Sequence, residues 1–140
     1  FNETVIDYTN GFDLISQNHK NTDIAFSPWI VAASEFGFES MAGWRVALRT
    51  KFVGKQYLDN TSNDARAIDP YWTNDIVVSY SIPSKHWKDL VISAMVNNVL
   101  DHQYESNGYT YGYIYGDLVT ENFYYPQAGA NWMASVKWRF

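Results

Sequence analysis

Apolar and polar residues alternate with a period of two in five separate runs, and a helical period is missing from almost all of the chain. Alternation of this kind, rich in β-branched and aromatic side chains, is typical of β-strands. It predicts strands over residues 30–39, 44–53, 71–82, 89–98 and 130–140. A strand remnant around Thr4–Tyr8 would be a sixth, followed by a polar connection that contains residues 18–21.

The acidic and basic side chains within these runs all lie at the polar positions of the alternation. Successive side chains of a strand point to opposite faces, so one face of the predicted sheet carries the charges and the other is apolar. A soluble β-sandwich also alternates, with its apolar face inward, so alternation alone does not indicate a membrane. Eight of them are the candidate residues of this face: Glu35, Glu39, Arg45, Arg49, Lys51, Asp75, Lys137 and Arg139.

Short and long connections alternate between the predicted strands. Segments 40–43 and 83–89 are short, whereas 54–70 and 99–129 are long. In an up-and-down sheet, this order puts both long loops at one end, as in outer-membrane barrels with long extracellular loops. Tryptophan is typical of the membrane interface, and every tryptophan lies at or near a predicted strand end: Trp29, Trp44, Trp72, Trp87, Trp132 and Trp138.

Composition excludes several classes of protein. The chain has 140 residues with no cysteine and a net charge of -5, which argues against a disulfide framework and a nucleic-acid binder. No apolar run is long enough for a transmembrane helix. The smallest membrane barrels have eight strands, more than the five or six predicted here. We therefore expect an all-β, antiparallel transmembrane β-barrel, of which residues 1–140 form the C-terminal part, ending in the closing strand.

Three segments resemble the C-terminal barrel strands of TonB-dependent outer-membrane receptors: FVGKQYLDN at 52–60, VNNVLDHQY at 96–104, and the ending from Tyr124 to Phe140. Ala130 and Ala134 depart from the Arg and Gly that are frequent in that family. The resemblance implies the last five or six strands of a 22-stranded barrel whose lumen is filled by a plug domain absent from this chain. It also implies active uptake of a siderophore, haem, cobalamin, a peptide or a glycan, driven by the TonB complex.

The resemblance places the protein in the outer membrane of a Gram-negative bacterium. Its partners would be membrane lipid, the rest of the barrel and the plug, the assembly machinery and a surface lipoprotein. The eight charged residues would face the lumen and the plug. Trp138 and Phe140 resemble the C-terminal signal that the assembly machinery reads.

The connection 99–129 holds seven of the eleven tyrosines and is the candidate for ligand binding. Glycines spaced between tyrosines predict a β-hairpin, and tyrosine offers a large contact area at low cost in rotamer entropy. Packing of loop against loop is the plainer interpretation of the same residues. The candidate ligand-binding residues are Tyr109, Tyr111, Tyr113, Tyr115, Tyr124 and Tyr125.

No pattern indicates an enzyme, a cofactor or a metal site. His19, His86 and His102 are far apart in sequence and are expected in solvated connections. Glu35 and Glu39 would be roughly 13 Å apart along a strand, too far for a pair of catalytic carboxylates. The acidic residues of segment 54–70 lack EF-hand spacing.

Two other functions fit parts of the pattern. A passive porin would have a similar barrel without plug or energy coupling. A soluble or surface-exposed β-domain would use the tyrosine-rich loop to bind a glycan or a protein.

Overall fold

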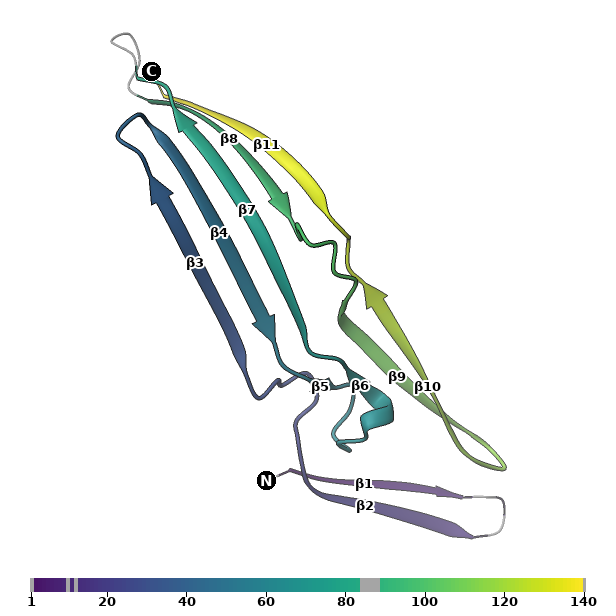
Figure 1. The fold of residues 1–140 in the computed structure, drawn as a ribbon. Helices are drawn as coiled ribbons and strands as arrows, with labels where there is room; N and C mark the ends of the chain where they lie inside the picture. The colour runs from purple at the N-terminus through teal and green to yellow at the C-terminus, as the bar shows by residue number, and fades with distance from the viewer. Residues whose placement is uncertain (1, 10, 12, 84–88, 140) are drawn as a thin grey trace. The chain divides into compact units, whose positions relative to one another are not determined.

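The computed structural model describes residues 2–9, 11, 13–83 and 89–139. The protein is all-β with antiparallel pairing, and its one described helical element is a short 3-10 turn (Figure 1). The elements are β1 (Asn2–Thr9), β2 (Leu14–Thr22), β3 (Val31–Glu39), β4 (Trp44–Val53), β5 (Gln56–Tyr57), η1 (Asp64–Arg66), β6 (Ala67–Ile68), β7 (Tyr71–Ser81), β8 (Asp89–Asn97), β9 (Glu105–Tyr115), β10 (Asp117–Pro126) and β11 (Asn131–Arg139).

Two compact units make up the chain. Unit 1 contains Phe1–Ile30, Val53–Tyr71 and Tyr104–Gln127, and unit 2 contains Val31–Phe52, Trp72–Gln103 and Ala128–Phe140.

Unit 2 is a five-stranded sheet with the order β11-β8-β7-β4-β3. These strands cover the five runs in which the sequence alternates, and each strand lies beside its predecessor in the sheet (Figure 1). The sheet is therefore an up-and-down meander. The ends of β4 and β8 and the starts of β7 and β11 lie at one end of it, where the long connections leave the sheet.

The strand register aligns the apolar positions of β7, β8 and β11 on one face. Directly paired residues of neighbouring strands point to the same face of a sheet. The apolar positions predicted separately for each strand therefore form one continuous surface. Ile76, Val78 and Tyr80 pair with Val96, Ala94 and Ile92, which in turn pair with Trp132, Ala134 and Val136.

This apolar face is uncovered. Of the hydrophobic residues in the described part of the sheet, Ala47 on the polar face is buried, as are Val53 and Tyr71 at the strand ends, whereas Phe36, Val136 and Trp132 expose 74%, 69% and 75% of their surface. A soluble domain buries such side chains between layers. The sheet has two exposed faces, one apolar and one polar, and no core between them.

The turn between β3 and β4 depends on Gly43. Its φ of +89° is one that residues with a Cβ rarely adopt, and a Cβ there would lie 2.6 Å from the carbonyl oxygen of Ser81. The amide of Ser81 in turn donates to the carbonyl of Gly43 at 2.9 Å. The turn therefore joins the end of β7 through a contact that only glycine permits.

Unit 1 has a small core in the segment predicted as a plain loop over 54–70. Leu58 and Ile68 are buried within this segment, and Val53 and Tyr71 are buried directly before and after it. The buried guanidinium of Arg66 lies 3.1 Å from Asp59 Oδ2 and donates to Thr61 Oγ1 at 2.9 Å. The segment thus folds into β5, η1 and β6 rather than an irregular loop.

The first 22 residues correct one expectation. The sequence predicts a strand remnant around Thr4–Tyr8 and then a polar connection, but residues 18–21 lie within β2, which pairs with β1 from Thr9↔Leu14 to Asn2↔Thr22. The cross-strand backbone bonds form this hairpin without an apolar stripe, because backbone pairing does not require one. His19 is therefore a half-buried strand residue rather than a solvated loop residue. His102 does lie in a connection, half-buried, and His86 lies outside the described residues.

Candidate functional site

Glu35 lies between two arginines on the polar face of the sheet. Its carboxylate accepts from Arg45 Nη2 at 2.9 Å and from Arg49 Nε at 2.7 Å, and Arg45 also lies 3.1 Å from Glu39. Strands β3 and β4 bring these four residues together because all four lie at the polar positions of the alternation and point to the same face of the sheet. Their side chains stay 38–69% exposed, so solvent screens each pair and its contribution to stability is small. The group orders the face more than it stabilises the fold.

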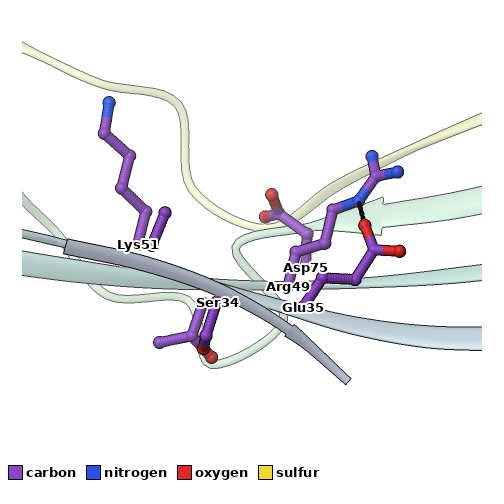
Figure 2. Close-up of a pocket in the computed structure, with 7 residues that line it drawn as sticks. Ser34, Glu35, Arg49, Lys51 and Asp75 are labelled. Atoms are coloured by element: carbon purple, nitrogen blue, oxygen red, sulfur yellow. Dashed lines mark hydrogen bonds and ion pairs between the residues drawn. The ribbon is translucent and has the colours of Figure 1, made fainter. Parts of the chain in front are cut away.

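A shallow hollow of about 390 Å³ opens beside this group, on the same unit. In Figure 2, the side chains of Glu35, Arg49, Lys51 and Asp75 rise from one side of the strands, and Ser34 points to the other side. Lys51 forms no ion pair with any described residue. The hollow therefore offers one uncommitted ammonium group next to paired charges.

Lys137 and Arg139 lie apart from this group. Both are on β11, where Lys137 pairs with Val91 and Arg139 with Asp89 of β8, and β7 lies between β8 and β4. Of the eight predicted charges, the structure brings six to one area and leaves these two at the opposite edge strand. Trp138, between them in the sequence, points to the apolar face instead. Phe140 lies outside the described residues.

Tryptophans mark both ends of the apolar face. Trp72 and Trp132 lie at the starts of β7 and β11, and Trp44 and Trp138 lie at the opposite end of the sheet. All four are exposed, and the ring of Trp44 lies 4.5 Å from that of Tyr80. The six-residue step from Trp132 to Trp138 corresponds to roughly 20 Å along the strand.

Most of the candidate tyrosines share one face of the β9–β10 hairpin, which turns at Gly116 with φ +76°. Tyr111 pairs with Glu121 and Tyr109 with Phe123, so odd-numbered residues of both strands point the same way. The ring centroids of Tyr109 and Phe123 are 4.9 Å apart and stacked, and the Tyr113 hydroxyl donates to Glu121 Oε1 at 3.0 Å. We call this surface the tyrosine face: Tyr109, Tyr111, Tyr113, Tyr115, Glu121, Phe123 and Tyr125.

Tyr124 is not part of the tyrosine face. It pairs with Gly108, on the opposite side of the hairpin, where a Cβ on Gly108 would lie 3.2 Å from the Tyr124 ring and 3.1 Å from Leu58. Tyr124 therefore packs beside the small core of unit 1. The sequence pattern groups it with Tyr125, but adjacent strand residues point to opposite faces.

Two of the three acidic residues of segment 54–70, Asp59 and Asp64, are engaged in internal contacts. Asp59 accepts from Thr61 and pairs with Arg66, while Asp64 accepts from Lys55 and from the Tyr57 hydroxyl at 3.1 Å. The hydrogen bond to Asp64 raises the pKa of Lys55, and the bonds from Lys55 and Tyr57 lower the pKa of Asp64. Sequence reasoning missed this pair, because nothing in the residue spacing brings Lys55 back to η1.

No group of three or more potential metal ligands occurs within 2–9, 11, 13–83 and 89–139. No helix in the described part of the chain has the length and hydropathy of a membrane span. Comparisons with protein-family models, with curated proteins and with solved structures found no match.

Proposed function

We propose that this chain is the C-terminal part of the barrel of a TonB-dependent outer-membrane receptor, which takes up a scarce solute with energy from the TonB complex. The single observation that carries the proposal is the strand register, which aligns the apolar positions of β7, β8 and β11 into one uncovered face. Such a face needs an apolar surrounding, and lipid supplies one. The sequence resemblance supplies the family.

The two ends of the apolar face support a membrane-spanning role. Trp72 and Trp132 at one end, with Trp44 and Trp138 at the other, have the arrangement of the aromatic girdles that flank the lipid-facing band of a barrel. The tryptophans would lie at the two lipid–water interfaces.

The polar face would line the lumen. Glu35, Arg45 and Arg49 are paired with one another, which lowers the cost of holding charges in a confined interior. Lys51 and Asp75 border the hollow beside them and would meet the plug or lumen water (Figure 2). The outer edges of β3 and β11 would pair with further strands of the barrel, because a sheet in lipid must close.

Two adjacent substitutions on β11 test the membrane assignment. Ala134 and Ser135 are both small, exposed and in mid-strand, and they lie on the apolar and polar faces respectively. In a bilayer, Ala134→Arg costs about 2–4 kcal/mol and should block assembly, whereas Ser135→Arg should be tolerated. Outer-membrane insertion of the full-length protein, measured by protease resistance in cells, reports both. Equal assembly of the two variants would overturn the proposal.

Energy coupling needs a second measurement. Active uptake requires the TonB complex, whereas a passive porin would not. Cells that produce the protein should stop taking up its solute, whether siderophore, haem, cobalamin, peptide or glycan, when the TonB gene is deleted or the proton gradient is collapsed. Uptake that persists under both treatments would favour the porin.

A further inference from the structure

The β9–β10 hairpin carries negative charge only. Between Glu105 and Pro126 the chain has three acidic residues, Glu105, Asp117 and Glu121, and no Lys, Arg or His. A surface with this balance repels anions and attracts cations, more strongly at low salt. Anionic ligands are therefore disfavoured on the hairpin.

The rings of the tyrosine face are exposed, yet they support one another. Tyr113 and Tyr115, the least and the most exposed of the face, leave 38% and 84% of their surface to solvent. The ring centroids of Tyr109 and Tyr125 are 6.1 Å apart, and those of Tyr111 and Tyr113 are 6.0 Å apart. Mutual packing restricts the rotamers before any ligand arrives, which lowers the entropy cost of binding.

A carboxylate lies among these rings. Glu121 pairs directly with Tyr111 and accepts the hydroxyl proton of Tyr113 at 3.0 Å. Each carboxylate oxygen can accept two hydrogen bonds, so Glu121 can still take a charge-assisted bond from an incoming donor. A carboxylate flanked by aromatic rings suits a guanidinium group, which stacks on rings and donates to carboxylates.

We infer that the tyrosine face binds a basic peptide through its arginine side chains. The step from Tyr109 to Tyr115 corresponds to roughly 20 Å, the length of about six residues of an extended peptide. The inference rests on the hairpin alone and goes beyond the proposed function, because it holds whether or not the chain takes part in uptake.

Binding to the purified full-length protein tests the inference with three probes: a peptide of alternating arginine and glycine, one of alternating glutamate and glycine, and maltodextrin. The arginine peptide should bind, its affinity should fall as salt is raised, and the glutamate peptide should not bind. Salt-independent binding of maltodextrin without binding of the arginine peptide would make the face a glycan site and overturn the inference. Absence of binding by all three would overturn it as well.

Variants locate the binding on the hairpin. Glu121→Gln and Tyr111→Ala should each lower the affinity for the arginine peptide about two- to fivefold. Tyr111→Phe should keep the affinity, because the ring remains. Ile114→Ala is the matched control, since Ile114 is 45% exposed on the opposite face, against 58% for Tyr111. Equal affinities of Glu121→Gln, Tyr111→Ala and Ile114→Ala would place the peptide elsewhere. Peptide binding does not depend on the outcome of the assembly measurement, so its failure can be distinguished from that of the Ala134 and Ser135 variants.

Discussion

Glu35 of β3 and Arg49 of β4 are joined by a hydrogen bond of 2.7 Å between Oε2 and Nε, across a face that is otherwise open to solvent. The second carboxylate oxygen of Glu35 accepts a hydrogen bond from Arg45, so one acidic side chain binds two basic ones on the neighbouring strand. Two cations gathered on one carboxylate make Glu35 the residue on which the local order of this face depends.

Glu35→Gln should therefore loosen the two arginines with little loss of stability. The side chains are partly exposed and screened by solvent, so the midpoint of thermal unfolding should fall only slightly and stay close to that of Lys51→Gln. Lys51→Gln is the control, because Lys51 lines the same hollow without an ion pair among the described residues. Thermal unfolding in detergent measures both variants. A much larger fall in the midpoint for Glu35→Gln than for Lys51→Gln would contradict this prediction.

Gly43→Ala should destabilise the sheet by about 1–3 kcal/mol, because the new Cβ meets the Ser81 carbonyl and the backbone is left-handed there. Gly37→Ala is the matched control on β3, where a Cβ finds nothing closer than 3.9 Å. It should be neutral or slightly stabilising, since alanine reduces the entropy of the unfolded chain. Denaturant unfolding of the two variants compares them. Similar losses for both would contradict the special role of the β3–β4 turn.

Ile68→Ala should cost about 2–5 kcal/mol, because Ile68 is 1% exposed at the centre of the small core in unit 1. The loss should appear as faster amide hydrogen exchange in residues 53–71 and in the β9–β10 hairpin, whose Gly108 lies against Leu58. Val5→Ala, at a 52% exposed position of β1, should change exchange little. Unchanged protection in Ile68→Ala would mean that this segment has no cooperative core.

The sheet of unit 2 could be predicted from the sequence because its two faces differ so strongly. Each strand has one apolar and one polar side, so its sequence alternates with a period of two. The alternation therefore predicts that Val78, Ile92 and Val136 point to the same face, as they do. The grouping of Lys51 and Asp75 with Glu35 follows from the same parity. Their distances could not be predicted, because strand register depends on turns such as that at Gly43.

Other elements carry no such signal. Residues 18–21 are polar throughout, and they are strand only because β1 supplies backbone partners, as in Val5↔Asn18. Among the core residues, Ile68 lies in β6 and Leu58 directly follows β5, and these strands of two residues are too short to show a period. Composition groups Tyr124 with the other tyrosines, but the turn at Gly116 fixes a register that points its side chain away from them. Turn geometry and partner strands, rather than local sequence, decide these cases.

The Lys55–Asp64 pair should respond to pH at both extremes. The pKa of Asp64 is lowered chiefly by the hydrogen bond from Lys55, so its contribution to stability is present above the ordinary carboxyl pKa and is lost as pH falls through the depressed value. The pKa of Lys55 is raised by the same bond, so its contribution is lost as pH rises through the raised value. In Asp64→Asn, the pKa of Lys55 should return toward the ordinary lysine value, which NMR of the side-chain signals of Lys55 can follow. Asp69→Asn, in the same connection, is the control and should leave Lys55 unchanged; an equal change in both variants would mean that overall charge, not this pair, sets the pKa of Lys55.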